Sequence, residues 1–124
     1  MILDAGALVA AERNERDVWL QLHLAFVENE VPIIPSPVLA QVWRDGPRQA
    51  RLAQLVKNCH VESFDADAAK VVGIMCGKAG TTDIVDASVV HLASVTGFSV
   101  MTSDPRDLKL IGEANDVTVQ VIRV

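Results

Sequence analysis

Short apolar runs rich in β-branched residues alternate along this chain with longer stretches that carry the apolar spacing of helices. The expected strands cover residues 2–4, 31–35, 59–64, 98–102 and 117–124. The expected helices cover residues 5–13, 16–29, 36–43, 48–57, 65–77 and 81–97, with one more beginning at 104–105. Strands separated by helices favour a parallel sheet that is covered on both faces. We therefore predict a three-layer α/β/α domain with a parallel sheet of about five strands.

The chain has 124 residues, which is enough for one domain with one hydrophobic core, spanning 1–124. Its longest apolar runs are interrupted by Asp4 and Glu12, so we expect no membrane span. Met1 leads directly into the first strand without the basic and apolar regions of a signal peptide. Cys59 and Cys76 lie far apart in apolar surroundings and are expected to be reduced thiols. These features predict a cytoplasmic protein.

The net charge of −5 argues against a protein that holds nucleic acid mainly through bulk positive charge. Only 22% of the residues are charged and 50% are hydrophobic, so the acidity does not indicate a disordered tail. A nucleic-acid enzyme whose carboxylates hold a metal ion stays possible. The placement of the acidic residues therefore matters more than their number.

Four aspartates lie at the ends of expected elements. Asp4 ends the first strand, Asp104 follows the fourth, and Asp83 and Asp86 share one face of a helix's first turn. In a doubly wound sheet, ligands bind beyond the carboxyl ends of the strands, where the direction of the connections reverses. If the first and fourth strands are neighbours, Asp4 and Asp104 converge at that edge, and the preceding helix brings in the other pair.

Carboxylates that are forced together repel one another and raise one another's pKa unless a cation shares them. Oxygen ligands without His or Cys suit Mg²⁺, with Mn²⁺ also plausible, rather than Zn²⁺. A Mg²⁺ held in this way activates water and stabilises charge on a phosphodiester, which is the chemistry of a metal-dependent nuclease. Each of Asp83, Asp86 and Asp104 also has a structural explanation, because acids cap helices and favour the first helical turn.

Three segments, in this order, resemble the PIN domain: Asp4-Ala5-Gly6-Ala7-Leu8, the helix that opens at Asp86-Ala87, and Thr102-Ser103-Asp104. Within that group, residues 37–44 and 103–108 look like VapC-type toxins of bacterial toxin–antitoxin pairs. The resemblance spans essentially the whole chain, and its specificity lies in the ordered set. It implies a PIN-like fold, Mg²⁺-dependent endoribonuclease activity on RNA, a homodimer, and inhibition by a small VapB-type antitoxin.

The resemblance assigns metal ligation and catalysis to Asp4, Asp86 and Asp104, with Asp83 as an additional catalytic candidate. Ser103, inside the last motif, is expected to support these ligands. The chain departs from the family twice, because Gln41 stands where the family usually has a Glu, and Gly6 where it commonly has a Ser. Gln41 can hydrogen-bond a metal-bound water but brings no charge.

Asp45, one helical turn after Gln41, is an alternative source of that missing carboxylate. A site with one well-held Mg²⁺ is expected, with a second ion weak or recruited together with RNA.

Arg44, Arg48 and Arg51 recur at three- and four-residue spacing and form the main basic concentration. They indicate either an edge that follows RNA phosphates or an ordinary solvated helix face. Arg106, next to Asp104, either contacts a phosphate or pairs with a neighbouring acid. The apolar residues of the second helix, together with the segment Val38 to Trp43, are candidates for an antitoxin groove.

Two other functions compete with the nuclease. A receiver-like signalling domain has similar length and element order, but it needs adjacent acids after the first strand, and Asp4 is followed by Ala5. A PIN-fold module that binds RNA or its antitoxin with weak or no nuclease activity is the stronger alternative, because Gln41 replaces the usual acid.

Overall fold

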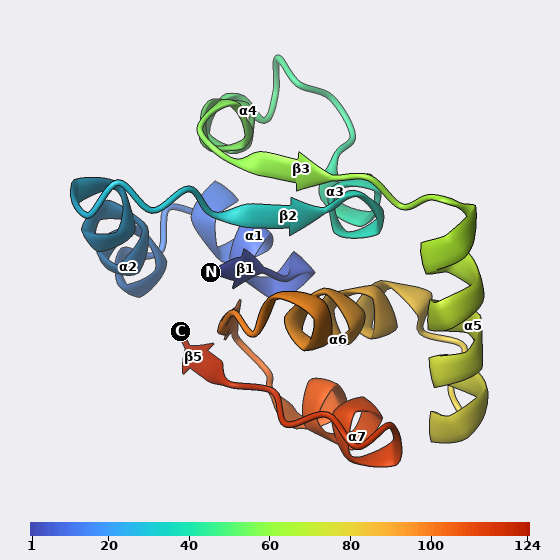
Figure 1. Ribbon diagram of the computed structural model, residues 1–124. Coiled ribbons are helices and arrows are strands. Elements are labelled where there is room, and N and C mark those ends of the chain that lie inside the picture. Colours follow the sequence, from blue (N-terminus) through green and yellow to red (C-terminus); the bar gives the residue numbers. More distant parts are fainter.

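The computed structural model describes residues 1–124 and consists of five strands and seven helices in alternation (Figure 1). The strands are β1 Ile2–Leu3, β2 Ile33–Pro35, β3 His60–Glu62, β4 Val100–Thr102 and β5 Val121–Arg123. The helices are α1 Ala5–Glu12, α2 Arg16–Val27, α3 Ser36–Val42, α4 Ala50–Lys57, α5 Ala66–Ala79, α6 Ile84–Thr96 and α7 Arg106–Ala114. The predicted alternation of strands and helices is confirmed.

All five strands are parallel and form one sheet in the order β3-β2-β1-β4-β5. The central strand β1 pairs with β2 through Ile2 and Ile33, and with β4 through Ile2 and Val100. The chain first moves outward from β1 to β3 and then returns to place β4 on the other side of β1. The expected neighbourhood of the first and fourth strands is therefore correct, and the connections reverse between them.

The helices form two groups on opposite faces of the sheet. Right-handed crossovers in opposite directions place α1 to α4 on one face and α5 to α7 on the other. The packing agrees, because α1 contacts α2, α3 and α4, whereas α5, α6 and α7 contact one another. Helix α3 also packs against α6 and so joins the two groups. Figure 1 shows α5, α6 and α7 together at the right and bottom of the view, with α2 at the left and α4 at the top.

A single cluster of 27 buried apolar residues forms the core. Its largest fully buried side chains are aliphatic or methionine, including Leu3, Leu8, Ile34 and Met101. Trp43 is 38% exposed and is not part of this core. The strands are only two or three residues long, so side chains of helices supply most of the buried surface.

Several boundaries differ from the sequence-based expectations for local reasons. Helix α4 begins at Ala50 rather than Arg48, because Gln49 stays outside the helix and hydrogen-bonds the preceding loop. Helix α5 continues through Gly77 and ends at Gly80, whose φ of 66° is left-handed. Strand β5 covers only residues 121–123, because the N–H of Val117 donates to the carbonyl of Gly112 and turns the chain back on α7.

Helix α3 begins at Ser36, as its expected range did, and has no side-chain cap. No helix of this structure combines the length and the hydropathy needed to cross a membrane.

Candidate metal centre

Asp4 lies at the carboxyl end of the central strand, where β1 meets α1. Its Oδ1 accepts a hydrogen bond of 2.8 Å from the N–H of Ala7, so its side chain caps α1. Its own N–H donates to the carbonyl of Met101 in β4. The residue is only 6% exposed. Asp4 is therefore a buried carboxylate that the sheet and the helix both hold in place.

Thr102 connects Asp4 with Asp104. The side chain of Thr102 is fully buried at the end of β4. Its Oγ1 accepts a hydrogen bond of 3.1 Å from the N–H of Asp104, and its hydroxyl hydrogen-bonds the carboxylate of Asp4. Asp104 itself is exposed, and its Oδ1 accepts from the N–H of Arg106 at 3.2 Å. The buried hydroxyl of Thr102 thus fixes the backbone of Asp104 relative to the side chain of Asp4.

Asp83 and Asp86 belong to the first turn of α6, as predicted. Oδ1 of Asp83 accepts a hydrogen bond of 2.9 Å from the N–H of Asp86 and caps the helix. Asp83 is exposed and Asp86 is half-buried. Both also line a cavity of about 190 Å³ between α5, α6 and α7. The helical cap explains Asp83, whereas the side chain of Asp86 caps no helix and hydrogen-bonds the side chain of Asp83.

The electrostatics join these acids into one site. Burial raises the pKa of Asp86 to about 7, and the negative charges of Asp83, Asp4 and Asp107 add to the effect. Burial also raises the pKa of Asp4, with a smaller contribution from Asp104, against the lowering effect of its hydrogen bonds. Asp4, Asp86 and Asp104 therefore share one electrostatic neighbourhood, although they come from three separate parts of the chain.

Two residues of this neighbourhood were missed by the sequence analysis. Asp107, on the first turn of α7, lines the cavity of Asp83 and Asp86 and raises the pKa of Asp86. Asp107 follows Asp104 by three residues, and this spacing could have indicated that Asp107 lies near the other acids. Thr102 was part of the recognised motif, but its bridging role depends on the pairing of β1 with β4.

Gly6 and Ser103 fit each other beside Asp4. A Cβ atom built on Gly6 would meet Oγ of Ser103 at less than 3.0 Å and Oδ1 of Asp4 at 3.4 Å. The absence of a side chain at position 6 therefore makes room for the hydroxyl of Ser103. The predicted position of Ser103 next to the acids agrees with this geometry.

Helix α3 contributes no carboxylate. Gln41 is exposed near its end and makes no hydrogen bond through its side chain. Asp45, considered as a replacement, lies in the following loop, where its Oδ2 is 3.4 Å from Nε of Arg48. Asp45 is also not among the charges that affect the pKa of Asp4 or Asp86. The second acid of the family pattern has no substitute at this edge.

The five aspartates of this neighbourhood suit a hard divalent cation by their chemistry, because their carboxylates offer oxygen ligands. A cation would also relieve the mutual repulsion that the pKa of Asp86 reports. No three His, Cys, Asp or Glu side chains, however, are gathered closely enough to hold an ion as they stand. The residues fit Mg²⁺ in kind and charge, but they are not assembled into a finished cage.

The predicted basic residues lie on two different surfaces. Nη1 of Arg51 donates to the carbonyl of Glu12, at the end of α1 opposite to Asp4, and α1 is about 12 Å long. Arg44 donates to the carbonyls of Ala40 and Trp43, and Arg48 pairs with Asp45. Only Arg106 lies at the acidic edge, with Nη2 at 3.6 Å from Oδ2 of Asp104.

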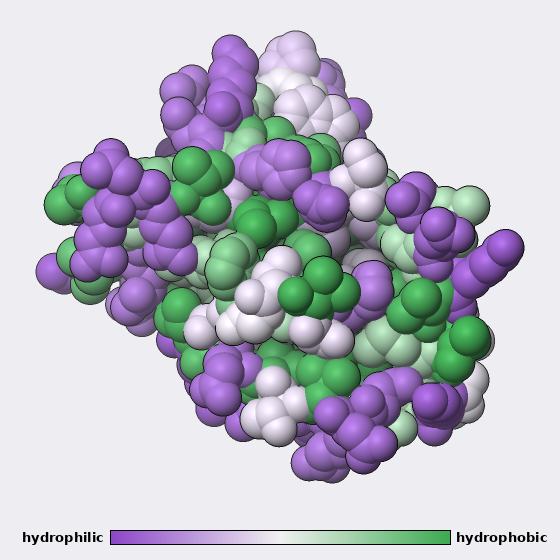
Figure 2. All heavy atoms as spheres, viewed as in Figure 1, coloured by the Kyte–Doolittle hydropathy of each residue, from purple (hydrophilic) through white to green (hydrophobic).

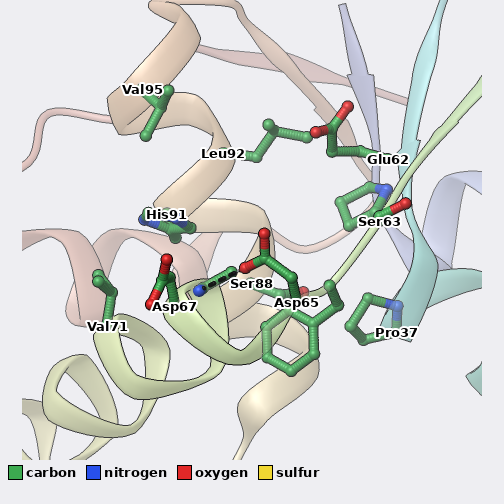
Figure 3. Close-up of a pocket in the computed structure, with 13 residues that line it drawn as sticks. Pro37, Glu62, Ser63, Asp65, Asp67, Val71, Ser88, His91, Leu92 and Val95 are labelled. Carbon is green, nitrogen blue, oxygen red and sulfur yellow. Dashed lines mark hydrogen bonds between the residues drawn. The ribbon is translucent and has the colours of Figure 1, made fainter.

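A cavity of about 360 Å³ lies outside the acidic site, between α3, α5 and α6. Figure 3 shows His91 on α6 above Asp67 on α5, with Leu92 and Val95 along the same helix. Asp65 borders this cavity but caps α5 through the N–H of Ala68. The cavity holds no cluster of metal-ligating side chains.

The sequence matches no protein-family model. No curated protein matches it in sequence either. In three dimensions, the chain is similar to a chain in the crystal structure of VapBC2 from Rickettsia felis bound to a DNA fragment from their promoter. The TM-score is 0.75 at 16% sequence identity, covering 99% of this chain and 97% of that one. The chain therefore has the PIN-like fold that its resemblance to VapC-type toxins predicts.

Proposed function

We propose that this protein is a cytoplasmic, Mg²⁺-dependent endoribonuclease of the VapC type, which hydrolyses phosphodiester bonds in RNA. The observation that carries the proposal is that Asp4 and Asp104 follow the neighbouring strands β1 and β4, close enough for their charges to interact, and that the charge of Asp4 also reaches Asp86 on α6. Burial and mutual repulsion of carboxylates are costly for the fold alone, so their meeting favours a functional site. The free thiols Cys59 and Cys76 fit a reducing compartment.

Each acid has a distinct part in the proposal. Asp4 is fixed by the sheet and by the cap of α1, so it suits the role of a rigid ligand. Asp86 is half-buried and its carboxyl group hydrogen-bonds that of Asp83, which a cation shared by the two would replace, and Asp104 is exposed at the mouth of the site, where substrate arrives. Mg²⁺ held by these residues would activate water and stabilise the charge that develops on the phosphodiester.

The direct test is cleavage of total RNA by the purified protein with Mg²⁺ or Mn²⁺. We expect EDTA, Asp4→Asn and Asp86→Asn each to abolish cleavage. Asp65→Asn is a matched control, since Asp65 caps α5 with the same 2.8 Å geometry by which Asp4 caps α1. Asn is itself a good cap, so both variants should keep their helices. Cleavage that survives EDTA or Asp4→Asn would refute the proposal.

A binding module with little or no nuclease activity is the second candidate. The specific observation in its favour is that α3 carries no carboxylate and that no three acids are gathered around one point. The two candidates differ in one result. Protein that binds RNA but cuts none of it with either metal would favour the binding module.

A homodimer is part of the proposal. Helices α5 and α6 expose large apolar side chains, namely Val71, Ile74, Ile84 and Val95. Figure 2 shows green apolar side chains over α5 among purple polar ones. Exposed apolar surface of this kind is typical of interfaces, and the cavity lined by Val71 and Val95 adds a concave element to it. Sedimentation of the purified protein tests the dimer.

A small VapB-type antitoxin is the other proposed partner, and the fold match to VapBC2 supports it. On α2, Leu20, Leu24 and Val27 are exposed at helical spacing and form one apolar stripe. Such a stripe fits an amphipathic segment of a partner. Helices α2 and α3 pack on α1 rather than on each other, so a groove that includes both has to cross α1.

A further inference from the structure

A second concave surface lies directly beside the acidic site, on the other side of α7. It has a volume of about 510 Å³ and is bordered by the loop after β4, by α7 and by the end of β5. Its lining includes Arg106, Lys109 and Arg123, with Asp104 at one end. These residues come from two elements that the sheet brings together, since Thr102 at the end of β4 is paired with Arg123. We call this surface the α7–β5 cleft.

Two of the three cations in the α7–β5 cleft are uncommitted. Lys109 and Arg123 form no ion pair within 4.0 Å, although Glu113 lies one helical turn after Lys109. Arg106 approaches Asp104 only to 3.6 Å, with both side chains well exposed. Three cations against Asp104 and Glu113 leave a charge of 3 − 2 = +1 in a protein of net charge −5. Cations without partners favour an anionic ligand from outside.

The cleft also adjoins the cavity that contains the acids. Leu110 lines both the α7–β5 cleft and the smaller cavity that contains Asp83, Asp86 and Asp107. The first turns of α7 thus separate a basic side from an acidic side, and Asp104 stands between them. A nucleic-acid strand that passes over Asp104 would place one phosphate at the acids and the following phosphates along the cleft.

We infer that the α7–β5 cleft binds backbone phosphates of single-stranded RNA on one side of the bond that is cut. This inference rests on the proposed function, because it takes RNA as the ligand of the adjacent acids. Arg106 and Arg123 carry planar guanidinium groups that match phosphate oxygens, and Lys109 adds a mobile point charge. The cleft makes no base-reading contact by itself, so it positions the strand without selecting a sequence.

The test is RNA binding in EDTA, where cleavage cannot interfere. The probe is a fluorescent single-stranded oligoribonucleotide of about 20 nucleotides, followed by anisotropy at several KCl concentrations. We expect Lys109→Gln with Arg123→Gln to weaken binding about tenfold and to reduce the salt slope of log K by about 0.7 for each charge removed. Glu113→Gln should change affinity in the opposite direction and strengthen binding.

Matched variants separate this cleft from general charge effects. Arg16→Gln with Lys70→Gln removes the same two charges on α2 and α5 and should leave affinity and salt slope close to those of the wild type. Arg48→Gln with Arg51→Gln tests the basic surface at the far end of α1. The inference is overturned if the Arg48 and Arg51 pair weakens binding while the cleft pair does not.

The outcome also distinguishes the cleft from the nuclease. If the wild type cuts RNA and the cleft variants bind and cut RNA equally well, the proposed nuclease function stands and the inference about the α7–β5 cleft is overturned. If the protein binds RNA through the cleft but never cuts it, the inference about the cleft stands and the proposed nuclease function is overturned. Absence of RNA binding by the wild type overturns the cleft outright.

Discussion

The hydroxyl oxygen of Ser103 lies against the α-carbon of Gly6, in the space where a side chain at position 6 would begin. The two residues are 97 positions apart and meet because β4 pairs with β1. Asp4 borders the same space through its Oδ1. The glycine in the first motif is thus explained by packing at the acidic site rather than by an unusual backbone angle, since its φ is not positive.

Gly6→Ser is expected to turn the hydroxyl of Ser103 away and to destabilise the protein by about 0.5–1.5 kcal/mol, because the atom in the way is the end of an exposed side chain that can rotate. Removing the opposing hydroxyl should relieve the clash, so Gly6→Ser combined with Ser103→Gly should recover most of the lost stability. Urea denaturation of the single and double variants measures this coupling. Gly73→Ala, at an open position of α5, serves as the control. If the changes in unfolding free energy of the two single variants simply added up in the double variant, the proposed fit between Gly6 and Ser103 would be contradicted.

Asp86 is expected to make the metal-free protein less stable as the pH rises. Its pKa is about 7 in the folded protein against an ordinary value of 3.8, so the folded state retains a proton that the unfolded chain releases. Stability therefore falls between about pH 4 and pH 7 and stays lower above that range. Mg²⁺ should shift the pKa of Asp86 downward. Carboxyl ¹³C chemical shifts followed through a pH titration, with and without Mg²⁺, measure both effects.

The variant that tests this prediction is Asp86→Asn, which removes the charge and keeps a side chain of similar size. We expect it to raise the melting temperature of the metal-free protein at pH 8 and to remove the stabilisation by Mg²⁺. An Asp86 that titrates near pH 4 without metal would contradict the electrostatic description of the site.

Thr102→Val is expected to destabilise the protein by about 1–3 kcal/mol, because it leaves the buried carboxylate of Asp4 and the N–H of Asp104 without a shared partner. The pKa of Asp4 should rise further, since the hydrogen bond from Thr102 lowers it. Thr118→Val, at an exposed position, is the control for the change of side chain. Equal stability of the two variants in urea would show that the Thr102 bridge contributes nothing.

Gln41→Glu is expected to increase Mg²⁺-dependent cleavage, because it restores a carboxylate at the position where the resembled family usually has one. Gln54→Glu adds the same charge at an exposed position of α4 and should change little. Cleavage rates at several Mg²⁺ concentrations compare the two variants. An unchanged Mg²⁺ dependence in Gln41→Glu would place that side chain outside the site.

Much of the fold followed from the order of elements. The handedness of crossovers and the switch of direction at β1 brought Asp4 and Asp104 to one edge, as expected. What escaped prediction depended on strand register and on loop contacts. Arg123 reaches the acidic edge only because β5 pairs with β4, and no local pattern at the end of the chain indicates this.

The placement of the basic residues also depended on loop contacts. Arg44, Arg48 and Arg51 are regularly spaced, which indicated either an edge that follows RNA phosphates or a solvated helix face. The segment between Trp43 and Ala50 is instead a loop held by Gln49, whose side chain accepts from two N–H groups and donates to the carbonyl of Val42. Helical spacing has no meaning across such a loop, so Arg44 and Arg48 interact with residues near them in sequence, whereas Arg51 donates to the carbonyl of Glu12 on α1.

The position of β1 at the centre of the sheet also governs when the site can come into existence. Strand β1 precedes the other four strands, yet one of its two neighbours, β4, follows only after β2 and β3, since Ile2 pairs with Val100. Asp4 therefore leaves the ribosome long before Thr102, Asp86 and Asp104 are available to complete its surroundings. A chain interrupted at any point before β4 carries the first acid but no acidic site, so the proposed nuclease is inactive until β4 and the loop that follows it have been made.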